Sequence, residues 1–524
     1  MRDKENLTAK LQKEVELLKQ EKAQLEMKFT ELELKLQWFE EQQRLYLIRT
    51  FGRSSEKTSL DQLSLFNEAE SEAKPEAPEP AIEEITGKRK KQQGHREEML
   101  KELPVEIIEY HLPQDEQKCA CGGNLHVMSK EVRKELKIVP AQLIVVEHVQ
   151  YVYACRDCEK NNINTTVKTA KMPKSALPGS IASSSAIAYV MSEKFVKGMP
   201  LYRQEQELER MGIEISRQTM ANWMIKSSEK WLKPLYERMR EHLTQKEILH
   251  ADETTLQVLK EPGRNADSKS YMWLYRTGRE DPPIILYDYQ TTRAGKHPAK
   301  FLKDFKGYLH TDGYDGYNLV SEIKSVGCWA HARRYFTDAL KAMPPKKDNA
   351  PTTTEEGLAF CNKLFEIERK LHDATPAERY EGRIAQSLPE LNKFKDWLKY
   401  QKPRVLPKSA LYKAIQYCLN QWDRLSAFLL DGRLEIDNNR AERSIKPFVI
   451  GRKNWLFSNT PKGAASSAVI YSVVETAKEN GLNPFAYLKY LFDKLPSINI
   501  DDINSLDEFM PWSLCLPQKC RVKK

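Results

Sequence analysis

The sequence predicts a multidomain protein of the α+β class, and three observations support this prediction. A chain of 524 residues is too long for a single hydrophobic core. A heptad repeat near the N-terminus predicts a long helix, and two cysteine pairs further along bracket a β-rich stretch. From residue 246 onward, strand-like alternation and helix-like periodicity follow one another, which predicts a mixed α/β core.

Residues 1–50 are predicted to form a coiled coil that mediates oligomerisation. Large apolar residues recur at intervals of seven: Leu11, Leu18, Leu25, Leu32 and Phe39. The alternative is a solitary amphipathic helix, but a pattern of this length exceeds an ordinary globular helix. We therefore expect the chain to form a homo-oligomer through this seam.

Residues 51–104 are predicted to be a linker that is largely disordered. The part from residue 67 to 84 is acidic, rich in Pro and Ala, and almost free of large apolar side chains. A basic cluster at residues 88–91 follows, and it fits either phosphate binding or a solvated linker.

Residues 105–165 are predicted to form a small zinc-binding domain around an alternating stretch from Leu136 to Tyr153. Four thiolates suit a tetrahedral structural Zn²⁺, and a Gly-Gly pair provides a tight turn. The alternative is four buried free thiols, because the first cysteine pair has one intervening residue where two to four are usual. The candidate ligands are Cys119, Cys121, Cys155 and Cys158, with His126 as a weaker substitute.

Residues 180–245 predict a helix-turn-helix DNA-binding region. One helical pattern ends near Met211, Gly212 suits the turn, and Ser216 is a candidate N-cap for a second helix through Trp223. Many helical hairpins of this kind bind nothing, so the motif alone leaves both interpretations open. If the second helix enters the major groove, the predicted DNA contacts are Arg217, Gln218 and Asn222.

A ribonuclease H-like core is predicted from two separated regions. In residues 246–340, three meandering strands are followed by a helix, a fourth strand, and a fifth strand that leads into a basic helix. Residues 432–480 are predicted to complete this core. Residues 341–431 are polar and helical and form an insertion, while residues 481–524 form a C-terminal helix and tail.

Acidic residues of this core are candidate metal ligands. Asp252 lies within a predicted strand, where an uncompensated carboxylate is costly to bury, and Asp312 ends another strand. Glu442 begins a helix, and Glu435 and Asp437 compete with it for the third position. Two strand-borne acids and one helix-borne acid can converge on Mg²⁺ or Mn²⁺, because such ions prefer oxygen ligands.

Three neighbouring acids also have simpler interpretations. Asp315 follows Gly313 in a turn and suits a helix cap or a solvated acid. Glu253 lies on the strand face opposite Asp252, so we expect it to form a salt bridge. Asp437 also fits the N-cap of the helix that follows it.

Charge and hydropathy limit the partners of the chain. Charged residues make up 30% of the sequence, and the formal net charge of +9 is compatible with a nucleic-acid partner. The sequence contains no run of eighteen apolar residues, and its N-terminus is polar. These features predict no membrane partner and a cytoplasmic location.

Taken together, the motifs resemble those of a known family. The chain is similar, over nearly its whole length, to a transposase of the insertion sequence 66 family, in particular the large type C subunit. The resemblance combines the heptad helix, the four-cysteine unit and the helix-turn-helix with short motifs. These motifs are RTFGRSSEK, KIVPAQL, ADETT, HTDGYDGY, WAHARRYF, DNNRAERSIKP and PFAYLKYL.

The resemblance implies a DDE transposase in which Asp252, Asp312 and Glu442 are the catalytic acids on a ribonuclease H-like fold. Two Mg²⁺ or Mn²⁺ ions would be bound, with Asp252 bridging both ions and each of the other two acids completing one coordination shell. The partner would be DNA, both the terminal inverted repeats of the element and its target. Basic residues after the third acid are predicted to contact this DNA: Arg443, Lys446, Arg452 and Lys453.

The resemblance further suggests small accessory proteins of the same mobile element as partners, and a protein associated with the nucleoid of a bacterium. Two other functions compete with DNA transposition and recombination. A non-catalytic, sequence-specific DNA-binding regulator derived from a transposase would leave the three acids inert. A coiled-coil assembly factor would leave both the acids and the helix-turn-helix without a purpose, so the intact set of acids favours the enzyme.

Overall fold

The computed structural model describes residues 2–50, 141–154, 167–343, 350–500 and 502–522. Within these ranges the chain combines many helices with a two-stranded antiparallel sheet and a five-stranded mixed sheet. The five-stranded sheet lies in the region where the sequence predicts a mixed core. The α+β class is therefore confirmed for the described residues.

Helix α1 (Arg2–Thr50) covers the predicted heptad segment without a break. Ion pairs between Lys22 and Glu26 and between Glu31 and Lys35 have the i,i+4 spacing that supports a solvated helix. Four apolar side chains of the seam are exposed in the single chain, with exposed fractions from 56% to 66%: Leu18, Leu25, Leu32 and Phe39. The helix is confirmed, and its self-association stays a prediction.

A short antiparallel pair follows, made of β1 (Val152–Ala154) and β2 (Val167–Thr169). The sequence predicts a longer alternating stretch, from Leu136 to Tyr153. Among its described residues, only those of β1 have a strand partner, and side chains such as Val145 are exposed. Alternation predicts a strand, but strand structure also needs backbone groups to pair with.

Three helices form the next unit: α6 (Ser184–Phe195), α7 (Leu201–Arg210) and α8 (Arg217–Ser227). Gly212, in the turn between α7 and α8, has φ +89°, a conformation that favours glycine. Ser216 caps α8, because its Oγ accepts a 3.2 Å hydrogen bond from the Thr219 amide. The predicted helix pair, turn and N-cap are confirmed. A π-helical turn, η2 (Ser228–Leu232), leads into α9 (Lys233–Thr244).

The central sheet has the strand order β5-β4-β3-β6-β7. Its strands are β3 (Ile248–Gln257), β4 (Lys269–Thr277), β5 (Ile285–Gln290), β6 (Gly307–His310) and β7 (Ile323–Val326). Strands β3, β4 and β5 form an antiparallel meander, whereas β6 is parallel to β3 and β7 is parallel to β6. The pairing of β3 with β6 ends at His250 opposite His310, because β6 stops there.

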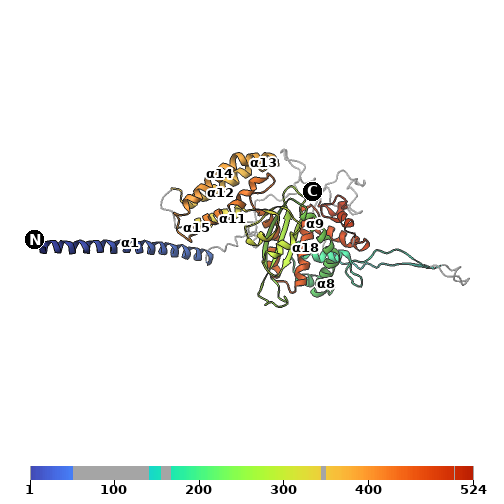
Figure 1. Cartoon of the computed structure of the whole chain (residues 1–524). Coiled ribbons are helices and arrows are strands. Elements are labelled where there is room, and N and C mark those ends of the chain that lie inside the picture. Colours follow the sequence, from blue (N-terminus) through green and yellow to red (C-terminus); the bar gives the residue numbers. More distant parts are fainter. Residues whose placement is uncertain (1, 51–140, 155–166, 344–349, 501, 523–524) are drawn as a thin grey trace, which may run out of the picture. The chain divides into compact units, whose positions relative to one another are not determined.

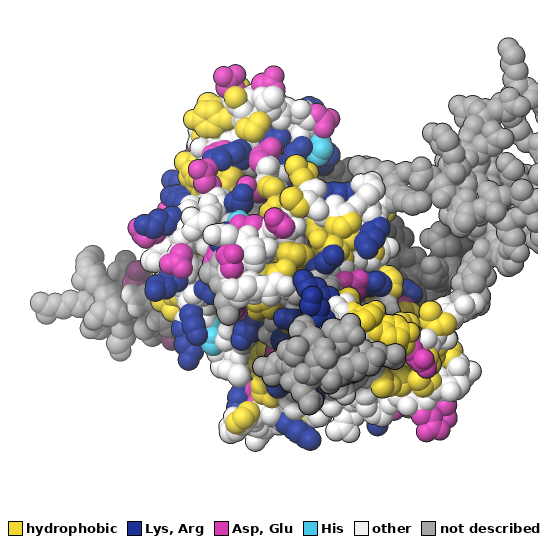
Figure 2. Space-filling view, turned by 90° about the vertical axis from the view of Figure 1, so that its right-hand side faces the viewer, with side chains coloured by type: hydrophobic (Ala, Val, Ile, Leu, Met, Phe, Trp, Pro, Cys, Tyr) yellow, Lys and Arg dark blue, Asp and Glu magenta, His cyan; other side chains and the backbone are white. Residues whose placement is uncertain are grey.

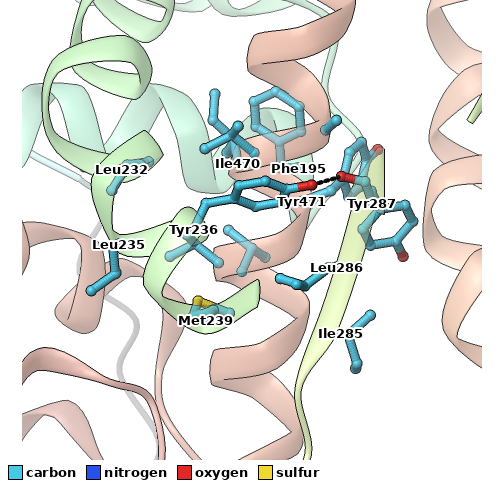
Figure 3. Close-up of a cluster of buried hydrophobic side chains, with 14 of the residues drawn as sticks. Phe195, Leu232, Leu235, Tyr236, Met239, Ile285, Leu286, Tyr287, Ile470 and Tyr471 are labelled. Atoms are coloured by element: carbon cyan, nitrogen blue, oxygen red, sulfur yellow. Dashed lines mark hydrogen bonds between the residues drawn. The ribbon is translucent and has the colours of Figure 1, made fainter. Parts of the chain in front are cut away.

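Helices α9, α17 (Asn439–Trp455) and α18 (Pro461–Glu479) pack on the antiparallel strands. In Figure 3, Tyr236 of α9 lies among apolar side chains of α18 and β5 and donates a 3.0 Å hydrogen bond to the Tyr287 carbonyl. Helix α18 also satisfies the edge of the sheet: the Thr476 hydroxyl bonds both backbone groups of Ile285, at 2.9 and 3.0 Å. Strand β5 therefore does not present an unpaired edge there.

The predicted helical insertion is confirmed as helical (Figure 1). It follows α11 (Trp329–Ala342) and has a second apolar core, in which Leu364, Phe394 and Cys418 are almost completely buried. Its helices are α12 (Thr353–Lys370), α13 (Pro376–Gly382), α14 (Leu388–Gln401), α15 (Ala410–Asn420) and α16 (Trp422–Ser426), with a π-helical turn η4 (Arg383–Ser387).

The remaining elements are short or C-terminal. Gly481 has φ +70° just after α18, and α19 (Pro484–Lys494) follows. The short elements are helix α10 (Lys296–Phe301) and the 3-10 turns η3 (Asp315–Leu319), η5 (Ala427–Leu430), η6 (Leu495–Ser497), η7 (Ile503–Phe509) and η8 (Gln518–Cys520).

The surface carries charges of both signs. On the face shown in Figure 2, Lys and Arg side chains are interspersed with acidic and hydrophobic ones. This mixture agrees with the moderate net charge of +9. On this face, a contact with phosphate would therefore depend on individual Lys and Arg residues and not on a uniformly basic surface.

Candidate active site

Asp252 lies on the central strand β3, beyond the end of its pairing with β6. Its Oδ1 atom accepts a 2.8 Å hydrogen bond from the Glu253 amide. Burial raises the pKa of Asp252 well above its ordinary value, and the charges of Glu253, Asp312 and Glu442 raise it further. The charges of these neighbouring acids, unlike the burial, would favour a cation bound beside Asp252.

Asp312 comes two residues after β6 ends, in a tight turn. Its Oδ1 atom accepts a 2.9 Å hydrogen bond from the Tyr314 amide, and the intervening Gly313 has φ +93°. This local bond orients the carboxylate, whose Oδ2 atom lies 3.9 Å from Arg293 Nη2. The alternative acid, Asp315, is an exposed residue at the start of η3.

Glu442 lies in the first turn of α17. Its Oε1 atom is buried and has no hydrogen-bond partner in the part of the chain that the structure describes. His331 Nε2 lies 3.8 Å from this oxygen, and Arg334 Nη2 lies 3.9 Å from Oε2. Both separations exceed hydrogen-bond length, so the carboxylate keeps its lone pairs. Burial lowers the pKa of His331, and this effect outweighs the opposing charge of Glu442.

The two acids that compete with Glu442 are already engaged by other groups. Glu435 receives hydrogen bonds of 2.7 and 2.9 Å from Arg440 and lies 3.0 Å from His250 Nε2. Burial alone would raise the pKa of Glu435, but hydrogen bonds from His250 and Arg440 outweigh it and lower this pKa. Asp437 accepts bonds of 3.0 and 2.7 Å from the backbone and side chain of Asn439. The prediction that Asp437 is the N-cap of α17 is wrong, because the N-cap residue is Asn438, one position later.

Glu253 forms the predicted salt bridge. Its side chain is 1% exposed, and its Oε1 atom accepts two hydrogen bonds from Arg293, one of them 2.8 Å long. Its other oxygen accepts a 2.7 Å bond from the Tyr317 hydroxyl. With both oxygens occupied, Glu253 is a structural acid beside Asp252 rather than an open ligand.

A buried polar cluster, which sequence reasoning missed, joins the elements that carry the three acids. The rings of His250 and His310 stack with centroids 4.1 Å apart. Asn438 is only 1% exposed; its Oδ1 atom accepts a 3.0 Å bond from His250 Nδ1, and its Nδ2 atom donates a 2.8 Å bond to the Ala251 carbonyl. The backbone N–H of Asn438 donates a 3.2 Å bond to Cys328 Sγ. The available signal was that a histidine precedes each aspartate by two residues.

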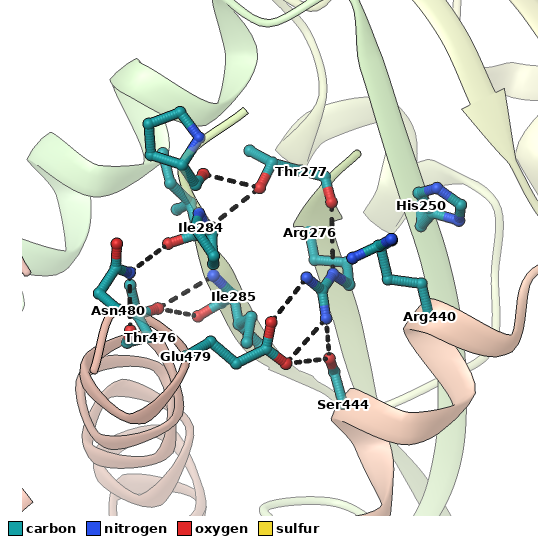
Figure 4. Close-up of polar contacts among 12 residues, drawn as sticks. His250, Arg276, Thr277, Ile284, Ile285, Arg440, Ser444, Thr476, Glu479 and Asn480 are labelled. Carbon is teal, nitrogen blue, oxygen red and sulfur yellow. Dashed lines mark hydrogen bonds and ion pairs between the residues drawn. The ribbon is translucent and has the colours of Figure 1, made fainter. Parts of the chain in front are cut away.

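A second buried contact fixes α17 against the sheet (Figure 4). Arg276 of β4 is 2% exposed and donates bonds of 3.0 and 2.8 Å to the two carboxylate oxygens of Glu479 on α18. Its guanidinium also donates to the hydroxyl of Ser444, two residues after Glu442. The position of the third acid is thus tied to the strand next to the one that carries Asp252.

Sequence comparison places this site in a known family. The family model described as "Transposase IS66 family" matches residues 179–466, which is more than half of the chain and contains all three acids. The chain belongs to the IS66 family of transposases. Three further models match: the zinc-finger binding domain of transposase IS66 over residues 116–159, the IS66 C-terminal element over 472–512, and "Transposase C of IS166 homeodomain" over 38–108.

Curated relatives cover most of the chain. The uncharacterized protein y4jD of Sinorhizobium fredii is 31% identical over 428 residues, which span 78% of this chain and 81% of that protein. The uncharacterized proteins y4hP and y4qI of the same organism are 29% and 30% identical and cover 75% and 78% of this chain, and 72% and 75% of their own lengths. The resemblance inferred from the motifs is confirmed.

The predicted DNA contacts of this IS66 member fall into two groups. On α8, Arg217, Gln218 and Asn222 are exposed. On α17, Arg443, Lys446 and Lys453 are exposed, but Arg452 is partly buried and donates to the Thr255 carbonyl and, at 3.4 Å, to Thr254 Oγ1. The structure therefore gives Arg452 a role in joining α17 to β3, and a contact of any of these residues with DNA stays a prediction.

The four cysteines predicted to bind zinc lie outside the described residues, although the IS66 zinc-finger model spans all of them. Of the helices that are described, none combines the length and the apolar character needed to cross a bilayer.

Proposed function

We propose that this chain is a metal-dependent DDE transposase, which cleaves DNA strands at the ends of an insertion sequence and joins them to target DNA. The observation that supports this proposal is that three carboxylates lie on neighbouring elements in an IS66 family member. Asp252 lies on β3, Asp312 follows the adjacent strand β6, and Glu442 lies on α17, which packs on β3.

The sheet supports a ribonuclease H-like core for this activity. An antiparallel meander of three strands, continued by two parallel strands on the side of the first, is the arrangement that the predicted core requires. The insertion enters after α11 and ends before α17, so it separates Glu442 from both aspartates in the sequence but not in space. Asp252 and Asp312 come from the adjacent parallel strands β3 and β6, just past the point where the pairing of these strands ends.

The donor atoms fit divalent ions such as Mg²⁺ or Mn²⁺. All three candidate ligands are carboxylates, which hard cations prefer, and one buried oxygen of Glu442 has no hydrogen-bond partner among the described residues. Two bound ions would activate water or a 3′-hydroxyl and stabilise the leaving oxygen. The sheet and α17 would hold the ligands at fixed positions, with Asp252, on the central strand, shared between the ions.

Residues beside the acids are suited to hold the DNA backbone. Two exposed cations lie on α17 near Glu442: Arg443 is the next residue, and Lys446 lies one helical turn further on. A guanidinium presents a planar fork of donors to a phosphate, so we assign phosphate orientation to Arg443 before Lys446. Asn438 is excluded from this role, because it is buried and both ends of its amide are engaged.

The other units deliver and position DNA. We assign recognition of the terminal repeats to α8, through exposed Arg217, Gln218 and Asn222. A structural Zn²⁺ would be held by the four cysteines within the matched zinc-finger segment. The exposed seam of α1 would join copies of the chain into an oligomer, and small accessory proteins of the element are candidate further partners.

Strand cleavage and joining on DNA that carries the element's own ends tests this function. Asp252→Asn, Asp312→Asn and Glu442→Gln are each expected to lower the rate by more than the roughly 10–100-fold typical of changes to outer-shell partners, while DNA binding persists. Asp437→Asn is the matched control, because its partner is Asn439. If the wild type binds these ends but never cuts them with Mg²⁺ or Mn²⁺ and accessory proteins present, the chain is a DNA-binding regulator instead.

A further inference from the structure

The imidazole of His331 faces the third acid from a different helix. His331 lies in the first turn of α11, and its Nε2 atom is 3.8 Å from Glu442 Oε1. This oxygen and His331 Nδ1 are both buried without a hydrogen-bond partner in the described part of the chain. The imidazole and the carboxylate therefore each have a buried atom without a partner among the described residues, and such atoms are costly unless a ligand or an ion satisfies them.

The separation suits a shared metal ion. Ligand atoms bound at about 2.1 Å in an octahedron lie roughly 3.0 Å apart when adjacent and about 4.2 Å apart when opposite. The observed 3.8 Å matches neither spacing, but it differs from the adjacent one by only about 0.8 Å and from the opposite one by about 0.4 Å. A nitrogen of His331, an oxygen of Glu442 and Cys328 Sγ also lie within 4.8 Å of one another. A shift of less than about 1 Å between the two ligand atoms would therefore suffice for His331 and Glu442 to share one ion.

Cys328 is the third member of this group, but its sulfur is already engaged. It accepts the amide hydrogen of Asn438 at 3.2 Å and also a backbone hydrogen bond from His331. Sulfur is also a soft donor, whereas Mg²⁺ and Mn²⁺ prefer harder ligands. Its part in the group is to hold the first turns of α11 and α17 together, and ligation falls to the other two side chains.

The two helices are held in register by further bonds. The Trp329 amide donates a 3.1 Å bond to the Ile436 carbonyl, just before α17. The Trp329 ring is fully buried, and its Nε1 atom donates a 2.7 Å bond to the Leu425 carbonyl. His331 and Glu442 are thus carried by rigid helix starts, as a preorganised ligand pair requires.

We propose that His331 is a nitrogen ligand of the divalent ion that Glu442 binds. This assignment rests on the proposed function, to which it adds a fourth ligand and a preference among metals. Imidazole binds transition-metal ions such as Mn²⁺ better than it binds Mg²⁺, which keeps to oxygen ligands. The ion at Glu442 should therefore favour Mn²⁺, whereas a position formed by the aspartates alone should discriminate less.

Electron spin echo spectroscopy of Mn²⁺ bound to the full-length protein tests the assignment without measuring activity. A directly bonded imidazole produces a ¹⁴N modulation, which we expect in the wild type and not in His331→Ala or His331→Gln. His372→Ala is the matched control, because His372 is an exposed histidine of the insertion, 69% accessible, and should leave the modulation unchanged. In both His331 variants the Mn²⁺ dissociation constant should rise about tenfold, while that of Mg²⁺ should change less than about twofold.

Variants of the acids separate failure of this assignment from failure of the proposed function. If Mn²⁺ binding requires Asp252 and Glu442 but shows no ¹⁴N modulation, His331 is not a ligand and the carboxylate site stands. If Asp252→Asn and Glu442→Gln leave Mn²⁺ binding unchanged, the carboxylate site itself is wrong. Circular dichroism of each variant checks that the fold is retained, and Gln is the milder substitution should Ala disturb α11.

Discussion

Asn438 should hold the candidate active site together, and Asn438→Ala is the perturbation that shows it. In the native structure its amide donates to the Ala251 carbonyl at 2.8 Å and bonds His250 Nδ1 at 3.0 Å. The first of these bonds lies just beyond the point where β3 loses β6 as a partner. Asn438 thus replaces a missing strand at the position next to Asp252, and Ala cannot do so.

The expected cost follows from the groups left without partners. Asn438→Ala leaves a buried carbonyl and a buried imidazole nitrogen unpaired, and each costs about 1–3 kcal/mol. A loss of about 3 kcal/mol, at roughly 2–4 °C per kcal/mol for a large domain, lowers Tm by about 6–12 °C. Because α17 begins at Asn439, Mn²⁺ affinity at Glu442 should weaken as well.

Differential scanning calorimetry and hydrogen exchange measure these effects, with Asn439→Ala as the matched control. Asn439 is the next residue and is less buried, and within the described part of the chain its side chain bonds only Asp437, so its change should lower Tm by less than about 3 °C. Exchange should increase in β3 and at the start of α17 in Asn438→Ala alone. Equal melting temperatures and exchange in the two variants would refute the idea that Asn438 joins β3 to α17.

Two further predictions concern buried charges of the core. Arg293→Met should destabilise the protein by about 1–3 kcal/mol, because it leaves the Glu253 carboxylate buried without its ion partner; the loss is limited because Arg293 is itself 41% exposed. In a double-mutant cycle, Glu253→Met in the same chain should restore most of this loss. Additive losses of the two variants would contradict the prediction. Burial raises the pKa of Asp288 on β5 to about 6, so its contribution to stability is present below pH 4 and is lost as pH rises through 6. The free energy of unfolding of Asp288→Asn should therefore rise by about 2 kcal/mol relative to that of the wild type as pH rises from 4.5 to 7, and a pH-independent difference would show that this carboxyl group is not desolvated.

The sequence predicted those parts of the fold that depend on local patterns. The helix start at Ser216, the turn at Gly212 and the end of a strand before Asp312 each follow from residues within one or two turns. The two aspartates were predicted as candidate ligands for the same reason, because a carboxylate within or just after an apolar strand is unusual. Choosing Glu442 over Glu435 required the family resemblance, and the structure supplies a physical reason: Glu435 is paired with Arg440.

What could not be predicted depends on the register between distant segments. His250 and Asn438 bond across 188 positions of sequence, and nothing local shows that either is buried. Likewise, the contact of His331 with Glu442 requires the starts of α11 and α17 to meet, and the whole insertion lies between them in the sequence. Periodicity shows which face of an element is apolar, but not which residue of another element it meets.

The stacked histidines explain why register matters at this site. Successive side chains of a strand point to opposite faces, so a slip of one residue between β3 and β6 would turn either Asp252 or Asp312 away from the other. In the native register His250 lies opposite His310, and each acid follows its histidine by two positions. Burial and the neighbouring His250 lower the pKa of His310 well below its ordinary value, so its ring stays neutral and packs as a flat, largely apolar plate. The observed register stacks this ring on that of His250 and places both aspartates beyond the last backbone pair of β3 and β6.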